Sequence, residues 1–404
     1  MKRKIKKAIA SGSIQAPPSK SMAHRLLVCG ALAKGACEIE GISKSKDMEA
    51  TLDCIRALGI EFQKTKDSVS INGGVEKGKG DRMFHCHESG STLRFFIPIS
   101  LVTGEECVFY GSERLMSRGL EVYEEIFENQ GITYTKETDK ITVNGKLKPD
   151  VFNVRGDISS QFISGLLFAL PLLNGDSVIN ITTELESEPY IDLTIECLKR
   201  FDVEIVKGKG TYYIKGNQRY VATNQIVEGD FSNSAFLDGF NLLDGSVSVF
   251  GLNDNSLQGD KIYREYYELI KNGTPVLDIS ACPDLGPVLF ALSSVHNGAT
   301  FVGTKRLKIK ESDRCEAMKT ELEKFGVTVE IFDNSVKVHS GAKEPSEQLY
   351  GHNDHRIVMA LVLLLSKFGG VIDGCEAVSK SYPDFFEDIS ALGIGSEIES
   401  ENNK

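Results

Sequence analysis

The sequence predicts an α/β (α+β) protein made of six copies of one βαβαββ repeat, grouped as two domains of three repeats each. Three observations predict this fold. Helix starts at Ser19, Ser89 and Ser159 follow one another at intervals of 70 residues. Each start leads into an apolar run, a glycine, a short alternating strand, a polar loop and a closing amphipathic helix. Pairs of short alternating segments, typical of β-hairpins, separate one repeat from the next.

The first repeat, residues 17–59, shows the pattern most clearly. Apolar residues keep helical spacing over residues 20–33, whereas residues 36–42 alternate in polarity as a strand does. A second amphipathic run, residues 47–58, stops at Gly59. The segment therefore predicts a helix, a strand and a second helix.

Five more helix starts continue this pattern along the chain. They lie at Ser89, Ser159, Phe231, Cys282 and Asn353. Hairpins are expected to pair residues 61–64 with 68–72, 132–135 with 141–144, and 203–206 with 212–215. The fourth repeat lacks the usual hairpin, since only 51 residues separate its start from the next one.

The six repeats divide into two domains, and the N-terminal strand joins the second. We expect residues 18–228 to form one domain with repeats one to three, and residues 1–17 plus 229–404 to form the other. The segment 218–230 is the expected crossing between them, because the hairpin of the third repeat ends just before it. Helix starts of equivalent repeats lie at one end of a domain, so we expect an active-site cleft between the domains.

Composition restricts the classes of function. The chain has 404 residues, 41% of them hydrophobic and 25% charged, as in a globular protein with two or three cores. A formal net charge of −11 argues against a nucleic-acid partner or an acidic membrane surface, because phosphate groups select basic proteins. The longest apolar run, residues 357–365, is about half of a bilayer span. Nine cysteines without a Cys-x-x-Cys pair favour a reducing compartment. We expect a cytoplasmic monomer whose partners are small molecules.

A protein with a negative net charge can bind an anion only at a local group of positive charges. The candidate anion-binding residues stand at the helix starts. At the first start a serine cap is combined with Lys20 and Arg25, and such a helix end attracts phosphate or carboxylate. An ordinary serine cap with two solvated basic side chains explains the same residues. At the second start, Gly90 allows a ligand close to the backbone, and Arg94 can brace the loop or the ligand.

Further polar groups stand at equivalent points of the later repeats. They are Arg118; Ser159, Ser160 and Gln161; Ser187 and Tyr190; Asp284, Lys310, Glu311 and Arg314; and Arg356 and Lys380. Lys310 and Arg314 would share a helical face if the closing helix has begun there, so a surface salt-bridge ladder explains this run equally well. The recurrence at equivalent points favours a cationic site for two or more anionic groups, with acid and base carboxylates among the cations.

One motif imitates a metal site. His85, Cys86, His87 and Glu88 are consecutive, but alternate side chains of a strand point to opposite faces. No second group of ligands at a spacing typical of zinc accompanies them. We therefore expect no metal here.

Five motifs in this order resemble those of the 5-enolpyruvylshikimate-3-phosphate synthase family, and they extend over nearly the whole chain. They are Pro18-Ser19-Lys20-Ser21 with Arg25, Ser89-Gly90-Ser91-Thr92-Leu93-Arg94, Ser159-Ser160-Gln161-Phe162, Lys310-Glu311-Ser312-Asp313-Arg314, and Asn353-Asp354-His355-Arg356. The resemblance implies two domains of three βαβαββ repeats that close over 3-phosphoshikimate and phosphoenolpyruvate. It also implies a place in the shikimate pathway toward chorismate and aromatic amino acids, glyphosate as an inhibitor, and no metal or organic cofactor.

The resemblance implies roles for single residues as well. Those for 3-phosphoshikimate are Lys20, Ser21, Arg25, Ser159, Ser160, Gln161, Ser187, Tyr190, Asp284 and Lys310. Those for phosphoenolpyruvate are Lys20, Gly90, Arg118, Gln161, Arg314, Arg356 and Lys380. The implied reaction adds the 5-hydroxyl of 3-phosphoshikimate to the enolpyruvyl group and then eliminates phosphate, with Asp284, Glu311 and Lys20 as catalytic residues.

Three positions depart from the family pattern, and two alternatives stay open. Glu88 and Arg306 stand where relatives carry asparagine, and Gly119 stands where proline is common, so affinity and inhibitor response are expected to differ. A related transferase acting on UDP-N-acetylglucosamine would have Lys-Asn at the first helix and usually a cysteine in the loop at residues 111–118. A non-catalytic anion-binding protein of the same fold would not need both carboxylates in a cationic cleft.

Overall fold

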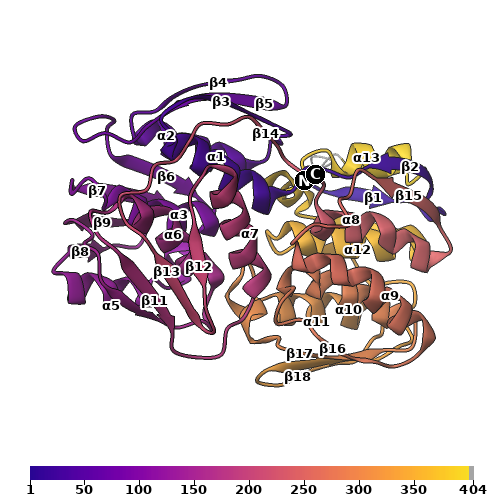
Figure 1. Cartoon of the computed structure of the whole chain (residues 1–404). Helices are drawn as coiled ribbons and strands as arrows, with labels where there is room; N and C mark the ends of the chain where they lie inside the picture. Colours follow the sequence, from indigo (N-terminus) through magenta and orange to yellow (C-terminus); the bar gives the residue numbers. More distant parts are fainter. Residues whose placement is uncertain (400–404) are drawn as a thin grey trace. The chain divides into compact units, whose positions relative to one another are not determined.

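The computed structural model describes residues 1–399, which divide into two compact units. Unit 1 contains residues 1–19 and the chain from Gly229 onward, and unit 2 contains Lys20–Glu228. Each unit has its own buried apolar core. Figure 1 traces the chain from the N-terminal strands of unit 1 through unit 2 and back to unit 1.

Every repeat of unit 2 has a four-stranded sheet of one strand order, in which the first two strands are parallel and the last two form an antiparallel hairpin. The second repeat has β6 (Met83–His87), β7 (Cys107–Gly111), β9 (Lys140–Asn144) and β8 (Thr133–Lys136). The third repeat has β10 (Val151–Val154), β11 (Ser177–Ile181), β13 (Thr211–Ile214) and β12 (Ile205–Lys207). Every second side chain of β6, β9 and β10 faces the core, which is why these segments alternate in polarity.

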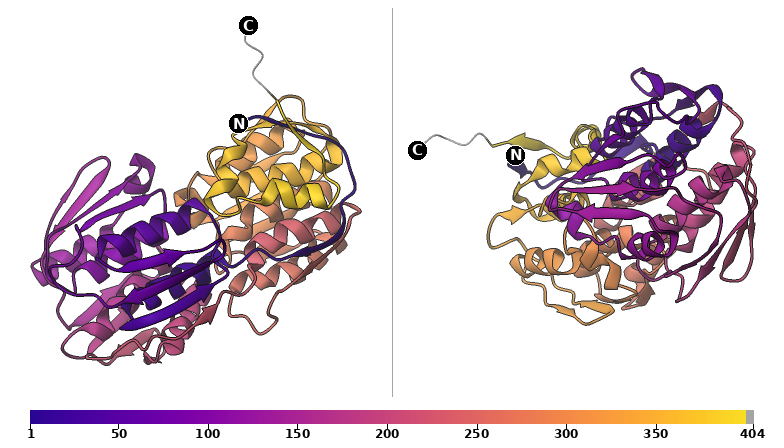
Figure 2. Two further views of the ribbon diagram at one scale, coloured as in Figure 1. Left: turned by 90° about the horizontal axis from the view of Figure 1, so that it is seen from above. Right: turned by 90° about the vertical axis from the view of Figure 1, so that its left-hand side faces the viewer.

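The first and sixth repeats take strands from distant parts of the chain. In the first sheet, β14 (Gln225–Ile226) lies beside β3 (Gly35–Glu40), followed by β5 (Ser68–Gly73) and β4 (Glu61–Lys64). The segment expected to cross between domains therefore contains a strand of the first sheet. In the sixth sheet, β1 (Arg3–Ile5) lies between β21 (Gly370–Asp373) and β22 (Ser396–Ile398), and β20 (Leu349–Tyr350) pairs with β21. Figure 2 shows the N-terminal segment along the C-terminal repeats of unit 1. The three expected hairpins are confirmed.

The fifth repeat keeps the common strand order and the fourth does not. The fifth sheet consists of β16 (Val276–Asp278), β17 (Ala299–Val302), β19 (Ser335–Val338) and β18 (Val329–Ile331). In the fourth repeat, β2 (Ser11–Gln15) and β15 (Ser246–Phe250) form a parallel pair and no hairpin follows, as the short spacing predicted.

Six apolar helices, one from each repeat, occupy the interiors of the two units. They are α1 (Lys20–Leu32), α3 (Gly90–Ser100) and α6 (Ser160–Ala169) in unit 2, and α8 (Phe231–Asp238), α10 (Gly286–Val295) and α12 (His355–Phe368) in unit 1. Side-chain oxygens of Ser89, Ser159, Asp230 and Asp354 cap the starts of α3, α6, α8 and α12. The apolar run 357–365 belongs to α12, and no helix within residues 1–399 is long and apolar enough to cross a membrane.

The remaining helices close the repeats. They are α2 (Lys46–Ala57), α4 (Glu113–Ser117), α5 (Glu121–Gln130), α7 (Glu188–Arg200), α9 (Tyr263–Asn272), α11 (Arg314–Lys324) and α13 (Phe385–Ala391), with the 3₁₀ turns η1 (Leu170–Leu172), η2 (Gly239–Leu243), η3 (Gly259–Ile262), η4 (Pro283–Leu285), η5 (Lys305–Ile309) and η6 (Cys375–Lys380). Lys310 follows η5, and α11 begins only at Arg314. The condition for a shared helical face of these two residues, a helix that has already begun at Lys310, is therefore not met.

Candidate active site

A carboxylate with three cationic neighbours lies at the start of the fifth repeat in unit 1. Asp284 stands in the turn η4, directly before α10. Its Oδ1 accepts hydrogen bonds from Arg314 Nη1 at 2.8 Å and from Lys310 Nζ at 3.3 Å. Its Oδ2 accepts a hydrogen bond from Arg356 Nη2 at 3.0 Å. Four predicted site residues from two repeats are thus brought together around one carboxylate.

Arg314 connects this carboxylate to two others. Its Nε donates to Asp354 Oδ2 and its Nη2 to Glu311 Oε2, both at 2.9 Å, in addition to the bond to Asp284. Burial disfavours the charged guanidinium, but the three carboxylates raise the pKa of Arg314 above its ordinary value. Only 1% of the side chain is exposed. A surface salt-bridge ladder, the alternative for this run, is therefore wrong, because the ion pairs of Arg314 are buried.

The sixth repeat contributes through the loop before α12. Asp354 Oδ1 accepts the backbone N–H of Arg356 at 2.9 Å, so this buried carboxylate both caps α12 and binds Arg314. Lys380, the last residue of η6, donates from Nζ to the backbone carbonyl of Asn353 at 2.6 Å.

Burial lowers the pKa of Lys310 to about 8, although Asp284 acts in the opposite direction.

Two residues of this loop adopt left-handed backbone conformations. His352 and Asn353 have φ values of 50° and 51°, which are uncommon for residues other than glycine. Glu321 of α11 stabilises the loop, because its carboxylate accepts hydrogen bonds from His352 Nε2 at 2.8 Å and from the backbone N–H of Tyr350 at 3.0 Å. The conformation directs the carbonyl of Asn353 toward Lys380.

In unit 2, the start of α1 holds a buried cation among neutral groups. Arg25 donates from Nε to Thr194 Oγ1 at 2.8 Å, from Nη1 to the carbonyl of Ser21 at 2.7 Å, and from Nη2 to the carbonyl of Tyr190 at 3.0 Å. Its guanidinium also lies 5.3 Å from the ring centroid of Phe95. Burial lowers the pKa of Arg25 to about 10. The alternative of a solvated basic side chain is therefore wrong for Arg25.

Lys20 is paired with a carboxylate that the sequence analysis did not single out. Its Nζ lies 2.9 Å from Asp47 Oδ2, and each side chain is 14% exposed. Asp47 stands in the first turn of α2, where the helix dipole favours an acidic residue. Asp354 is a second carboxylate, paired with Arg314, that the sequence analysis did not propose by itself. The available signal in both cases was an acidic residue at a helix start.

The second and third repeats contribute a connected set around Arg94. Its Nη1 donates to Gln161 Oε1 at 2.7 Å, and its Nη2 donates to the backbone carbonyls of Arg118 at 3.2 Å and Gly119 at 3.4 Å. Arg94, expected to brace either the loop of its own helix start or a ligand, thus holds the backbone at residues 118–119 and the side chain of Gln161. The guanidinium of Arg118 lies against Gly90, since a Cβ added there would be 2.8 Å from Arg118 Nη1. The glycine is needed for this close approach.

Three serines stand at helix starts of the third repeat. Ser159 Oγ accepts the backbone N–H of Gln161 at 3.3 Å and so caps α6, and Ser160 is the first residue of that helix. Ser187 precedes α7, is 1% exposed and has a φ of 55°. Tyr190 lies in the first turn of α7, where its carbonyl accepts Arg25. Buried hydroxyls at the N-termini of two helices form a neutral setting for an anion, because the helix dipole favours negative charge there.

The motif that imitates a metal site is divided between environments. His85 stacks on Tyr110 at 5.0 Å between ring centroids, Cys86 is buried, and His87 Nε2 lies 3.2 Å from Asp53 Oδ2. No group of three or more metal-ligating side chains is found within residues 1–399.

Two of the positions that depart from the family pattern are at least partly buried. Arg306 is buried in η5, and Glu88 is half-buried.

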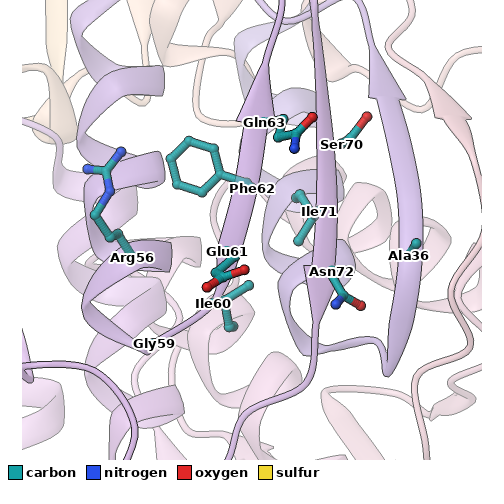
Figure 3. A pocket seen from close by; sticks show the side chains of 10 residues that line it. All are labelled: Ala36, Arg56, Gly59, Ile60, Glu61, Phe62, Gln63, Ser70, Ile71 and Asn72. Carbon is teal, nitrogen blue, oxygen red and sulfur yellow. The ribbon is translucent and has the colours of Figure 1, made fainter.

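A hollow lies away from these residues, on the first sheet of unit 2. Figure 3 shows this hollow, about 770 Å³ in volume, between the end of α2 and the strands β3, β4 and β5. Arg56 stands over the ring of Phe62 at 4.9 Å. The predicted site residues are absent from its lining. We therefore regard the charged residues described above in each unit, and not this hollow, as the candidate site residues.

Comparison with solved structures identifies the class of fold. EPSP synthase from Acinetobacter baumannii matches with a TM-score of 0.79 and 21% sequence identity, covering 99% of this chain and 100% of that one. The enolpyruvyl transferase NikO from Streptomyces tendae matches with a TM-score of 0.78 and 13% identity, covering 98% of each chain. At these identities the likeness establishes the enolpyruvyl transferase fold and nothing narrower.

Comparison of sequences identifies the family. The family model described as EPSP synthase (3-phosphoshikimate 1-carboxyvinyltransferase) matches residues 5–389. A 3-phosphoshikimate 1-carboxyvinyltransferase from Clostridium kluyveri is 44% identical over 405 residues, covering 95% of both chains. The enzyme of the same name from Clostridium acetobutylicum is 42% identical over 414 residues, covering 96% of this chain and 97% of its own. The chain belongs to the EPSP synthase family.

Proposed function

We propose that this protein transfers the enolpyruvyl group of phosphoenolpyruvate to the 5-hydroxyl of 3-phosphoshikimate and releases phosphate. The observation that carries this proposal is the 44% sequence identity of the chain, over 95% of both chains, to a relative named 3-phosphoshikimate 1-carboxyvinyltransferase. The reaction is a step of the shikimate pathway toward chorismate and the aromatic amino acids. The buried cations and carboxylates described above support the same chemistry.

Residues of unit 2 bind most of 3-phosphoshikimate in this proposal. Ser159, Ser160 and Ser187 hold its phosphate, because helix N-termini offer N–H groups and a favourable dipole to an anion. Arg25 and Ser21 hold its carboxylate. The remaining contacts come from Lys20, Gln161 and Tyr190 of unit 2 and from Asp284 and Lys310 of unit 1. The neutral partners of Arg25 support its assignment, since a bound carboxylate supplies the missing counter-charge.

Phosphoenolpyruvate carries a phosphate and a carboxylate and therefore requires several cations. The proposed contacts are Lys20, Gly90, Arg118 and Gln161 in unit 2 and Arg314, Arg356 and Lys380 in unit 1. Charge-assisted hydrogen bonds to such groups contribute about 1.5 to 3 kcal/mol each. The guanidinium of Arg118 against Gly90 and the hydrogen bond of Arg356 to Asp284 support these assignments.

The proposed chemistry is an addition followed by an elimination. The 5-hydroxyl oxygen forms a bond to C2 of phosphoenolpyruvate while its proton passes to a base and C3 gains a proton, which gives a tetrahedral intermediate. C3 then loses a proton, the bond from C2 to the phosphate oxygen breaks, and phosphate leaves. Asp284 and Glu311 carry these protons with help from Lys20. The cations around Asp284 support its use as a carboxylate.

Phosphate release from phosphoenolpyruvate tests the proposal against its alternatives. We would measure release with 3-phosphoshikimate, with UDP-N-acetylglucosamine, and without an acceptor. Release with 3-phosphoshikimate alone is expected. Release with the UDP-sugar would transfer the assignment to the related transferase, and no release in any mixture would favour an anion-binding protein.

We also infer a cytoplasmic monomer. Nine free, buried thiols in the described chain support a reducing compartment. The separate apolar core of each unit supports folding without a partner chain. Fractionation of cells that express the protein would test its location, and sedimentation at several protein concentrations would test the monomer.

A further inference from the structure

Arg94 is a buried arginine of unit 2 without an assigned part in the proposed reaction. It lies one turn after Gly90 in α3, and 3% of it is exposed. Its guanidinium lies 4.8 Å from the ring centroid of Phe162. Two of its hydrogen bonds end on residues proposed to bind phosphoenolpyruvate, Gln161 and Arg118, and a third ends on the carbonyl of Gly119.

The three hydrogen bonds fix the distance between two elements. A guanidinium is planar and presents its N–H groups in fixed directions, so one side chain can hold α6 and the turn after α4 in register. The backbone of Arg94 is fixed as well, because Tyr123 donates its hydroxyl to the carbonyl of Arg94 at 2.5 Å. Gly165 allows the close packing of α3 and α6, since a Cβ there would lie 2.2 Å from the same carbonyl.

Arg94 also decides which end of the Gln161 amide is presented to a ligand. A guanidinium only donates, so the amide oxygen of Gln161 must face Arg94 and the amide nitrogen must face away. That nitrogen donates to Ser91 Oγ at 2.8 Å and has a second N–H. The presented group is therefore a donor, which suits an anionic oxygen.

We propose that Arg94 is a positioning residue for phosphoenolpyruvate, acting through Gln161 and the backbone of Arg118. The inference rests on the proposed function. Arg94→Lys keeps the positive charge but loses the planar fork. Misplaced binding groups can reduce an enzyme's efficiency by up to about 100-fold, so we expect the KM for phosphoenolpyruvate to rise about 10- to 100-fold. The KM for 3-phosphoshikimate should rise much less, because Gln161 contacts both substrates in the proposal whereas Arg118 contacts phosphoenolpyruvate alone.

A double-mutant cycle separates positioning from general packing. If Arg94 acts through Gln161, Arg94→Lys should cost less in the Gln161→Ala background than in the wild type. Arg82→Lys is a matched control, because Arg82 is also a buried arginine of unit 2 and binds Glu105 and the carbonyl of Glu76 away from the proposed site. The control should lower the melting temperature without changing the ratio of the two KM values.

The outcomes distinguish this inference from the proposed function. Equal rises of both KM values, or an unchanged KM for phosphoenolpyruvate in an active Arg94→Lys enzyme, would overturn the positioning role alone. A folded wild-type protein that releases no phosphate would overturn the proposed function and the inference that rests on it. If Arg94→Lys does not fold, Ser91→Ala frees the same amide of Gln161 without disturbing a buried charge. That variant should raise the KM for phosphoenolpyruvate selectively, and an unchanged value would reject the presentation of this amide to phosphoenolpyruvate, on which the role of Arg94 through Gln161 depends.

Discussion

Arg25 of unit 2 and Arg314 of unit 1 are both buried, yet their surroundings are opposite. Arg314 donates to the carboxylates of Asp284, Glu311 and Asp354, which raise its pKa. Arg25 donates to a hydroxyl and two carbonyls, and burial lowers its pKa to about 10. Arg25 has no ion pair with a carboxylate within the described residues 1–399.

The difference separates two uses of a buried arginine. A buried charge without a counter-ion is costly and persists where a ligand supplies the opposite charge. A buried charge among carboxylates holds those carboxylates in place, and its loss leaves them uncompensated. The comparison therefore supports Arg25 as a seat for an anion and gives Arg314 the additional task of organising Asp284 and Glu311.

We expect the largest effect from removing the charge of Asp284. This carboxylate is the centre of the unit 1 cluster, which it forms with Lys310, Arg314 and Arg356. Asp284→Asn preserves the shape of the side chain but removes the proposed proton carrier, so turnover should fall by about 100- to 10,000-fold. Binding of 3-phosphoshikimate should persist, because most of its proposed contacts lie in unit 2. Single-turnover phosphate release and calorimetric titration would measure the two quantities. Near-normal turnover would exclude Asp284 from the mechanism.

Arg314→Met tests the organising role. Removing one partner of a buried ion pair destabilises a protein by about 3 to 5 kcal/mol, so we expect a loss of this order in the free energy of unfolding. Arg264→Met provides the matched control, since Arg264 pairs with Asp254 at 2.8 Å on the surface of the same unit. The control should change stability by less than about 1 kcal/mol. Equal losses in the two variants would contradict the organising role.

The sequence predicted the repeats because each carries its own local pattern. Alternation in residues 61–72 and 132–144 was sufficient to locate hairpins, and a uniformly apolar run located α12. The N-terminal strand was assigned to the second domain, but the pairing partners of the borrowed strands were not predictable from a local pattern. β1 and β14 pair with segments more than 180 residues away, and the stability of such a pairing depends on the assembled sheet and not on a local period.

The candidate site shows the same division between local and assembled features. Serines and basic residues at helix starts indicated Arg25 and Ser159, because capping and the helix dipole are local effects. The partners Asp47 and Asp354 were not proposed, since an acidic residue at a helix start is common and its ion pair forms only after folding. In the fifth repeat, one sequence pattern fits both a surface salt-bridge ladder and a buried network of ion pairs. The burial of Arg314, which the sequence pattern does not give, distinguishes the two.

Arg25→Met should affect binding more than it affects folding. A charge-assisted hydrogen bond contributes about 1.5 to 3 kcal/mol, so the dissociation constant of 3-phosphoshikimate should rise about 10- to 100-fold. The loss in unfolding free energy should be smaller than in Arg314→Met, because no carboxylate is left without a partner. Calorimetric titration and chemical denaturation would measure both. Unchanged affinity for 3-phosphoshikimate would remove Arg25 as the carboxylate seat.

A substitution at Gly90 can displace a third arginine, Arg118, while the charge of Arg118 is kept. In Gly90→Ala the added Cβ would lie 2.8 Å from Arg118 Nη1, so the guanidinium must move. We expect the KM for phosphoenolpyruvate to rise about tenfold while that for 3-phosphoshikimate stays the same. Gly273→Ala is the control, because a Cβ at that position meets no atom within 4 Å. A normal KM for phosphoenolpyruvate in Gly90→Ala would argue against Arg118 as a contact.

The smallest effect concerns the cation of the unit 1 cluster whose charge depends on pH. Burial lowers the pKa of Lys310 to about 8, so the ammonium is charged at pH 7 and loses its proton above pH 8. Binding of the anionic 3-phosphoshikimate to the free enzyme requires the charged form, and its kcat/KM should therefore fall by up to about tenfold between pH 8 and 9. The phosphate groups of both substrates are already ionised in this range, with second pKa values near about 6. Lys310→Arg should abolish the decline, because a guanidinium keeps its charge at these pH values. An identical decline in both enzymes would assign the titration to a group other than Lys310.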